Sequence, residues 1–336
     1  MLCIGQNCQG NRDLITHFVT GGSGYVGRNI IRRLKARGDA VKALARSETA
    51  LAAVAALGAE PVRGDMMDKA SFASGMAGCD TLVHAAADTS HGVVESDQLR
   101  TNVEGARNVF LAAREAGIRR AVHVSTESVL LSGRPLANAD ETVPYPRRFA
   151  GSYSESKAIA EQSVLALSSD AMPVIVIRPR FVWGRDDSRA LPQLVDAART
   201  GKLVWIGGGS YLTSTAHIDN VAEGVALALE KGRGGEIYFI TDGPPHTFRE
   251  FATRLLIAVG VDVPDAAAPR WLVRGMVSAG SWLERASGGR FPTMLNLQEY
   301  ATAGVEVTLD ISKAERELGY RPVTTLEQGL TTLQLP

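Results

Sequence analysis

Short apolar runs alternate with longer helix-like segments through the first half of the chain. Each run has five to seven residues and is almost continuously apolar. Strands with apolar side chains on both faces are typical of a parallel sheet that helices cover on both sides. We therefore predict an α/β fold, a doubly wound parallel sheet with right-handed crossovers. The predicted strands are residues 16–20, 40–45, 60–65, 81–87, 120–126 and 173–178, and the predicted helices are 25–38, 47–57, 69–77, 95–116 and 152–168.

Three glycines follow the first predicted strand at a spacing that favours phosphate binding. Gly21, Gly24 and Gly27 lie where that strand passes into the next helix. A glycine in such a turn lets the backbone approach a pyrophosphate, and the helix N-terminus offers free N–H groups and a partial positive charge. A merely tight turn is the alternative. The position after the first strand of an α/β chain favours a dinucleotide site.

The end of the second predicted strand indicates which dinucleotide fits. Sites of this kind often carry Asp or Glu about 20 residues after the glycines, where it holds the adenosine ribose hydroxyls. Here the strand ends in Arg46 and Ser47, without a carboxylate. An arginine pairs with a 2′-phosphate and stacks on adenine. We predict NADP(H) as the preferred cofactor; NAD(H) is the alternative, in which Arg46 is only a solvated surface residue.

Tyr153 and Lys157 are four residues apart in a predicted helix, so both side chains lie on one face. A phenol loses its proton at about pH 10. A neighbouring ammonium and a cationic nicotinamide both favour the phenolate, which would make Tyr153 a better proton donor and acceptor near neutral pH. An ordinary exposed helix pair has the same spacing. Ser125 and Thr126 favour the catalytic interpretation, because a hydroxyl at a strand end can orient a substrate carbonyl.

Composition argues against several other classes of protein. The chain has 36 basic and 36 acidic residues, so it lacks the basic surface of a nucleic-acid-binding protein. Cys3, Cys8 and Cys79 form no CxxC pair, which argues against a disulfide scaffold or zinc site and suits the cytoplasm. The six histidines show no HxxxH spacing, so no metal site is predicted. No apolar run reaches the roughly 18 residues of a membrane span.

The order of these motifs resembles the extended short-chain dehydrogenases/reductases of the epimerase/dehydratase superfamily. The matching segments are VTGGSGYVG, RGDMMD, HAAA, TNVEGARNV, VSTESV, YSESK, IRP and HIDNVA, with a weaker match at ISKAERELGYRP. They occur in family order and cover nearly the whole chain. Residues 237–251 are similar to the 3β-hydroxysteroid dehydrogenase-like and dihydroflavonol 4-reductase-like branch.

The resemblance implies a role for each matching residue. Tyr153 would be the catalytic acid/base, Lys157 would bind the nicotinamide ribose and lower the phenol pKa, and Thr126 rather than Ser125 would polarise the carbonyl. Asn102 would be structural or part of a proton relay. The implied cofactor-binding residues are Gly21, Gly24, Tyr25, Val26, Gly27, Arg46, Asp65, Met66, Ala85, Ala86, Ala87, Tyr153, Lys157, Pro179 and Val182.

The resemblance also implies two domains and a homodimer. The nucleotide part would be a Rossmann domain and the smaller, discontinuous part a substrate-binding domain, because the chain becomes irregular after Pro179, returns to the sheet and leaves it again. The predicted divisions are 16–180 with 215–242 for the Rossmann domain, 181–214 with 243–336 for the substrate-binding domain, and 1–15 for a loose N-terminal extension. The dimer would form through helices 95–116 and 152–168.

The substrate is predicted to be a small molecule, bulky and mostly apolar, that carries a ketone or secondary alcohol. Phe181 stands where the nucleotide-sugar branch has asparagine, and Trp183, Trp205 and Tyr211 add apolar surface to the predicted pocket. Hydride would pass between nicotinamide and the carbonyl carbon while Tyr153 transfers the proton.

Two other functions stay open at this point. One is a nucleotide-sugar epimerase or dehydratase, in which Arg180 and Arg185 would clamp a phosphate. The other is a non-catalytic NADP-sensing regulator, although such relatives typically lack the tyrosine and lysine. Residues 271–283 group Leu272, Met276, Ala279 and Leu283 on one helical face, which predicts a lid or interface helix, or alternatively attachment to a membrane surface.

Overall fold

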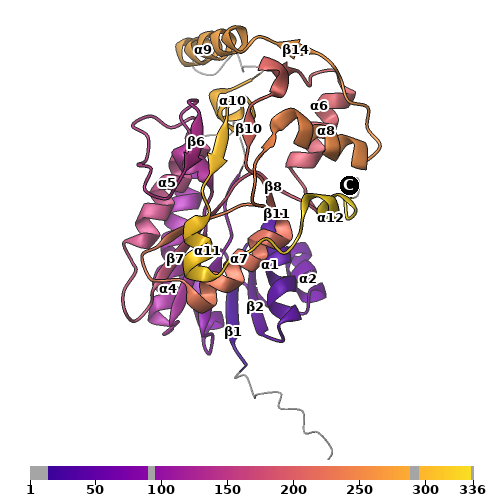
Figure 1. Ribbon diagram of the computed structural model, residues 1–336. Helices are drawn as coiled ribbons and strands as arrows, with labels where there is room; N and C mark the ends of the chain where they lie inside the picture. The colour runs from indigo at the N-terminus through magenta and orange to yellow at the C-terminus, as the bar shows by residue number, and fades with distance from the viewer. Residues whose placement is uncertain (1–13, 90–94, 288–294, 334–336) are drawn as a thin grey trace, which may run out of the picture.

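A sheet of seven parallel strands forms the larger part of the molecule (Figure 1). The computed structural model describes residues 14–89, 95–287 and 295–333, so the predicted N-terminal extension lies almost entirely outside the described residues. The strand order is β12-β7-β5-β4-β1-β2-β3. The strands are β1 (Thr16–Thr20), β2 (Ala40–Ala45), β3 (Glu60–Arg63), β4 (Thr81–His84), β5 (Arg120–Val124), β7 (Val174–Pro179) and β12 (Ile237–Ile240). The predicted α/β fold is confirmed.

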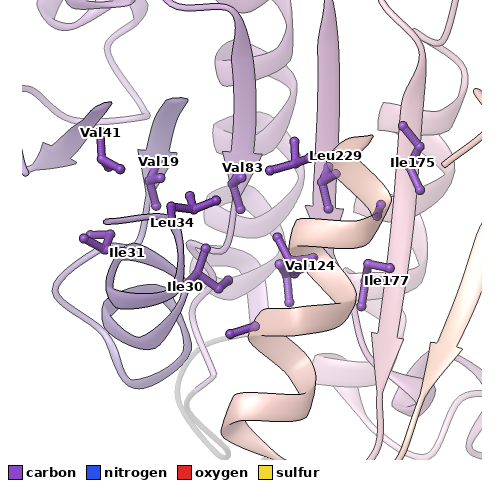
Figure 2. Close-up of a cluster of buried hydrophobic side chains, with 14 of the residues drawn as sticks. Val19, Ile30, Ile31, Leu34, Val41, Val83, Val124, Ile175, Ile177 and Leu229 are labelled. Carbon is purple, nitrogen blue, oxygen red and sulfur yellow. The ribbon is translucent and has the colours of Figure 1, made fainter. Parts of the chain in front are cut away.

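Helices cover both faces of this sheet because successive strand side chains point to opposite sides. Val19 and Val83 point to the face that α1 and α7 cover, and Figure 2 shows them close to Leu34 of α1 and Leu229 of α7. Phe18 and Leu82, the residues before those two valines, point to the face that α4 and α5 cover. These helices are α1 (Tyr25–Ala36), α2 (Glu48–Ala56), α3 (Glu95–Arg100), α4 (Ala106–Glu115), α5 (Ser152–Leu165) and α7 (Ile218–Lys231).

Two predicted helices differ from the structure. The segment predicted as one helix at 69–77 consists of two 3-10 helices, η1 (Lys69–Ser71) and η2 (Ala73–Met76), because Phe72 between them leaves helical geometry at φ −131° and is fully buried. The predicted helix at 95–116 is continuous, but a π-helical segment, η3 (Thr101–Gly105), separates α3 from α4.

A smaller region lies at the carboxyl ends of the parallel strands, shown above the main sheet in Figure 1. Its sheet has the order β13-β10-β15-β6. The strands outside the main sheet are β6 (Leu136–Ala139), β8 (Val182–Trp183), β9 (Trp205–Ile206), β10 (Leu212–Thr213), β11 (Ala216–His217), β13 (His246–Thr247), β14 (Ala267–Ala268) and β15 (Val307–Leu309). The remaining helices are α6 (Ala190–Arg199), α8 (Phe248–Ala258), α9 (Arg270–Ser287), α10 (Leu297–Ala303), α11 (Ser312–Leu318) and α12 (Leu326–Leu330).

The structure places two segments differently from the predicted domain division. β6, predicted in the Rossmann domain, pairs with β15 in the smaller sheet. α11, predicted in the substrate-binding domain, returns to the main sheet, where Ala314 and Leu318 join the core beneath α7. Both differences arise because the chain crosses between the two regions more often than its composition indicates.

Helix α9 forms over the segment with the predicted apolar face. Val273 and Val277 are buried against the smaller region, whereas 43% of Leu272 and 61% of Met276 are exposed. The side chain of Leu283 lies outside the described residues. Within the described ranges, no helix has both the length and the hydrophobicity that crossing a bilayer requires.

Candidate active site

The glycine turn is built from backbone that leaves no room for side chains. Gly21 has a φ of 72°, in the left-handed region that favours glycine, and its carbonyl oxygen accepts a hydrogen bond from the Gly24 N–H at 3.0 Å. A Cβ on Gly27 would lie 2.1 Å from the Gly21 oxygen, whereas a Cβ on Gly24 would lie 3.3 Å from it. The backbone therefore requires the first and third glycines most strictly.

The start of α1 is open to an anion. Gly24 is its N-cap, no side chain caps the first N–H groups, and the first turn, which contains Tyr25 and Val26, has no acidic residue. The turn borders a cleft of about 520 Å³. The cleft is lined by Thr20, Gly21, Ser23, Gly24, Leu44, Ala45, Arg46, Gly64, Asp65, Met66, Ala85, Ala86, Ala87, Asp88 and Thr101. These residues suit the adenosine and pyrophosphate part of a nicotinamide dinucleotide.

Arg46 lies at the rim of this cleft with 80% of its side chain exposed. Its Nη1 atom is 3.4 Å from Oδ2 of Asp65, and an exposed ion pair of this kind contributes little to the stability of the fold. The Ser47 hydroxyl accepts a hydrogen bond from the Ala50 N–H and caps α2. Arg46 can therefore turn toward a phosphate, whereas Ser47 serves the helix.

Thr126 and Tyr153 meet at the carboxyl end of the main sheet. Thr126 follows β5, Tyr153 lies in the first turn of α5, and their side chains are hydrogen-bonded. Ser125 instead extends the strand through a bond from its N–H to the Ile177 carbonyl. The Ser125 hydroxyl is buried without a hydrogen-bond partner among the described residues. The structure thus brings Thr126, the hydroxyl chosen from the sequence, to the phenol.

The electrostatics of the phenol differ from the expectation that the sequence supports. Burial, followed by the negative charge of Glu127, raises the pKa of Tyr153 to about 12, while Arg189 and the bond with Thr126 act in the opposite direction. The sequence predicts a lowered pKa, through Lys157. That expectation was for a site that also holds a cationic nicotinamide, and it stays a prediction; in the protein without cofactor the Lys157 ammonium is bonded to the Val124 carbonyl.

Lys157 is almost fully buried, one turn after Tyr153. Its Nζ donates a hydrogen bond to the Val124 carbonyl oxygen at 3.0 Å. Burial lowers the pKa of Lys157 to about 8, against the opposite effect of Glu161. His84 and His123 stack nearby with ring centroids 5.3 Å apart, and burial lowers the pKa of His84 to about 3. Burial also lowers the pKa of His123, so both histidines are neutral at physiological pH and Lys157 is the local cation.

Asn102 holds the backbone beside the cleft. Its Oδ1 accepts a hydrogen bond from the Asp88 N–H at 2.7 Å, and its Nδ2 donates to the Asp88 carbonyl and to Ser156 Oγ, each at 3.0 Å. Because both ends of the amide are occupied, the structure favours the positioning role over the proton relay. Asn102 lies in the π-helical segment and is buried.

The predicted aromatic pocket residues lie in two layers. Phe181 is partly buried and packs edge-to-face on Phe248 and Phe251. Trp183, Trp205 and Tyr211 are buried behind it, and their polar atoms bond to Asp242, Pro264 and Ala303 respectively. Phe181 and Val182 follow Pro179 at the end of β7, and of the four aromatic residues Phe181 is the one that is only partly buried.

The sequence analysis assigned no role to two charged residues that act on the phenol electrostatically, Glu127 and Arg189, the second of which precedes α6. Arg180, which we considered only as a phosphate clamp, is paired with Glu127. Glu127 itself directly follows Thr126, and that adjacency is the signal that could have identified it.

Comparisons with known proteins agree with this geometry. Residues 18–269 match the model of the 3-beta hydroxysteroid dehydrogenase/isomerase family. The chain is 49% identical to 4-hydroxy-2-methyl-3-oxo-4-farnesyl-3,4-dihydroquinoline-1-oxide ketoreductase of Stigmatella aurantiaca, over 94% of this chain and 95% of that one. It is 33% identical to 3-beta-hydroxysteroid dehydrogenase of Mycolicibacterium neoaurum, over 95% and 90%.

A solved structure supports the same class. dTDP-glucose 4,6-dehydratase from Streptomyces venezuelae, with NAD bound, is 28% identical, covers 94% of this chain and 95% of its own, and has a TM-score of 0.73. Fold and site thus define an extended short-chain dehydrogenase/reductase, and the chain belongs to the 3-beta hydroxysteroid dehydrogenase/isomerase family. It is an NAD(P)-dependent oxidoreductase acting on a ketone or alcohol, which sets aside the regulator alternative.

Proposed function

We propose that this protein is an NADP(H)-dependent reductase of ketones on bulky, mostly apolar substrates. The observation that carries the substrate class is the pairing of two arginines. Arg180 is fully buried and bonds to Glu127 and to the Thr302 carbonyl, and Arg185 forms a bidentate pair with Asp219. Neither guanidinium group is therefore available to bind a substrate diphosphate. A buried diphosphate would need such cations or backbone donors in place of the water molecules that it loses.

Two further observations support an apolar substrate. Phe181 presents a ring at the end of β7, where burial of hydrocarbon contributes about 25 cal/mol per Å². The 49% identical relative is named for a ketone substrate that carries a farnesyl group, and the 33% identical relative for a steroid. Both substrates offer a carbonyl or hydroxyl on a large apolar body.

The side chains divide the chemistry among them. The nicotinamide would supply or accept the hydride. Tyr153 gives a proton to the carbonyl oxygen during reduction and takes it back during oxidation. Thr126 orients that oxygen, and Lys157 binds the nicotinamide ribose from its buried position. Asn102 fixes the Asp88 backbone along the cofactor cleft.

Three finer points belong to this proposal. Arg46 at the cleft rim supports NADP(H), although it pairs loosely with Asp65. Leu99 and Ile159 are exposed on α3 and α5, which supports the expected dimer through these helices. The cytoplasmic location rests on a sequence with three cysteines and no CxxC pair.

A paired substrate panel tests the proposal. We expect saturable NADPH oxidation with aryl, steroid or long-chain ketones and no reaction with UDP- or dTDP-sugars. Thermal shift measurements with the same compounds report binding independently of turnover. Epimerisation or dehydration of a sugar nucleotide, without reduction of any apolar ketone, would assign the chain to the nucleotide-sugar branch instead.

A further inference from the structure

Three exposed apolar side chains gather on one helix at the outer end of the smaller region. In α9, which Figure 1 shows away from the main sheet, Trp271, Leu272 and Met276 are 75%, 43% and 61% exposed. Of the described large hydrophobic residues, Trp271 is the most exposed. Single apolar residues are normal on a protein surface, but a group of them marks a surface that binds something.

The opposite face of α9 is fixed to the protein. Val273 and Val277 are buried and belong to the hydrophobic core of the smaller region. Arg270 lies over the Tyr211 ring, with its guanidinium carbon 5.0 Å from the ring centroid. Buried contacts therefore set the orientation of the helix, and its exposed apolar side chains point away from the rest of the chain.

Helix geometry places these side chains in one sector. At about 100° per residue, five exposed residues fall within about 140° of the helix circumference, and they are Trp271, Leu272, Gly275, Met276 and Ala279. We call this sector the outer face of α9. Arg270 and Arg274 border it on the side of Trp271. The outer face is thus apolar or small throughout, with basic residues along one edge.

We propose that the outer face of α9 docks on the surface of a bilayer that contains anionic lipids. A helix that lies in a membrane interface buries its apolar face among the lipids and keeps basic side chains at the headgroups. Tryptophan is enriched at this depth, because its ring is apolar and carries one polar N–H. The helix stays packed on the protein through Val273 and Val277, so the docking is attachment to one membrane surface.

The charges favour an anionic membrane over a second copy of the chain. Residues 270–280 include Arg270 and Arg274 and no acidic residue, and Arg274 has no ion pair among the described residues. In a symmetric dimer the same surface of both copies meets, so the arginines of the two copies would come together and repel. Anionic headgroups instead attract both arginines, and salt weakens that attraction.

Docking would bring the aromatic layer of the smaller region close to the membrane. Arg270 of α9 contacts Tyr211, which stacks on Phe248, and Phe248 in turn packs on Phe181. Bulky apolar molecules concentrate in lipid, so the enzyme would meet its substrate there. This last step rests on the proposed function, whereas the docking itself goes beyond that function and is measured without turnover.

Co-sedimentation of the full chain with lipid vesicles tests the proposal. The wild type should bind vesicles of equal parts phosphatidylglycerol and phosphatidylcholine at least about tenfold more tightly than vesicles of phosphatidylcholine alone, since each arginine contributes about fivefold. About 0.5 M NaCl should remove most of this difference. Equal binding to the two kinds of vesicle, or binding to neither, would overturn the proposal.

The variant Trp271→Ser/Leu272→Ser/Met276→Ser removes the apolar part of the outer face. Its affinity for the anionic vesicles should fall at least about tenfold. Ile257→Ser/Val323→Ser is the matched control, because these two residues are 64% and 54% exposed on other elements, and it should bind like the wild type. Equal binding by the wild type and the triple variant would contradict the proposal.

Arg274→Glu tests the charge separately and leaves the apolar side chains in place. It should weaken binding to the anionic vesicles about tenfold, because an attraction becomes a repulsion. Arg114→Glu, at an exposed arginine of α4, makes the same change of net charge and should have less than about a twofold effect. Equal losses in both variants would show that net charge, and not the outer face, governs binding.

Light scattering and turnover complete the test. If a second copy covers the outer face, the wild type forms an oligomer that the triple serine variant loses while vesicle binding is unchanged, and the proposal is wrong. Turnover of a water-soluble ketone without lipid should be equal in the wild type and the triple variant. Absence of turnover in both would contradict the proposed function, whereas absence of vesicle binding would contradict only the docking.

Discussion

The Lys157 ammonium donates its hydrogen bond to the Val124 carbonyl across 3.0 Å, in a setting where the side chain is almost fully buried. The enzyme thus holds a cation in its interior without a carboxylate bonded to it among the described residues. The lowered pKa of Lys157, about 8, expresses the same cost. A residue kept for function at the expense of stability is the natural interpretation.

We expect Lys157→Met to be inactive and more stable than the wild type. The fall of the Lys157 pKa from the ordinary lysine value of 10.5 to about 8 corresponds to about 3 kcal/mol of destabilisation below pH 8. Loss of the hydrogen bond to Val124 destabilises the variant by roughly 1 kcal/mol, so its net gain in unfolding free energy is roughly 2 kcal/mol. Urea unfolding of both proteins at pH 7 measures this difference.

The pH dependence of that gain is the check on its cause. Between pH 8 and 10.5 the unfolded chain binds the proton and the folded chain does not, so wild-type stability rises with pH in this window. The advantage of the methionine variant should therefore shrink as pH approaches 10. An advantage that is the same at pH 7 and pH 10 would point to packing rather than charge.

Tyr153→Phe should keep NADPH affinity near normal and remove most turnover. The ring still packs, but no proton can move to the substrate oxygen. Isothermal titration with NADPH and single-turnover kinetics separate the two effects. Full activity in this variant would contradict the acid/base role of the phenol.

Arg46→Asp should reverse the cofactor preference from NADPH to NADH. Losing a charge-assisted phosphate contact costs on the order of 1.5–3 kcal/mol, or about 10- to 150-fold in kcat/KM for NADPH. Arg63→Ala is the control, since Arg63 is also an exposed arginine and pairs with Glu48. Equal use of both cofactors by the wild type would reduce Arg46 to a surface residue.

Gly27→Ala should impair cofactor binding far more than Gly24→Ala. The new Cβ would lie 2.1 Å from the Gly21 oxygen in the first variant and 3.3 Å from it in the second, where a small shift suffices. We expect Gly27→Ala to be destabilised by at least about 2 kcal/mol and to lose detectable NADPH binding. Similar melting temperatures and affinities for the two variants would show that the turn is less rigid than described.

Phe181→Asn should weaken the binding of apolar ketones without straining the backbone. Phe181 has a φ of 41°, which asparagine tolerates better than phenylalanine. Loss of the ring contacts with Phe248 and Phe251 should raise KM for an apolar ketone about tenfold, by roughly 1.4 kcal/mol. Phe181→Leu keeps an apolar side chain, so its KM should lie between those of the wild type and Phe181→Asn. An unchanged KM would place the substrate elsewhere.

The main sheet was predictable because local signals agree with one another. β1 and β2 have the predicted bounds, since each buried run is closed by residues that stop a strand. β6 was missed because its partner, β15, lies some 170 residues further along the chain and no local sequence pattern indicates the pairing. Strand pairing over such separations depends on the packed fold.

The site shows the same division. Tyr153 and Thr126 were recognisable from motif spacing, and the structure brings them together. The pairing of Arg180 with Glu127 could not be recognised from the sequence, because each residue alone is an ordinary charged residue. Only the fold shows that the two are buried against each other. For the same reason Arg180 was considered as a phosphate ligand, although its hydrogen bonds are used inside the protein.

The π-helical segment η3 sets the rotational phase of everything that follows it in its helix. A π-helical turn holds one residue more than an α-helical turn, and each α-helical residue advances the helix by about 100°. Deleting one residue between Thr101 and Gly105 would therefore convert the π-helical turn into an α-helical turn and leave Val109 and Phe110 on the sheet they cover, whereas a deletion between Ala106 and Val109, in regular α-helix, would rotate Phe110 and the residues after it by about 100°. The chain thus holds one extra residue at η3 without exchanging the buried face of α4 for its exposed one.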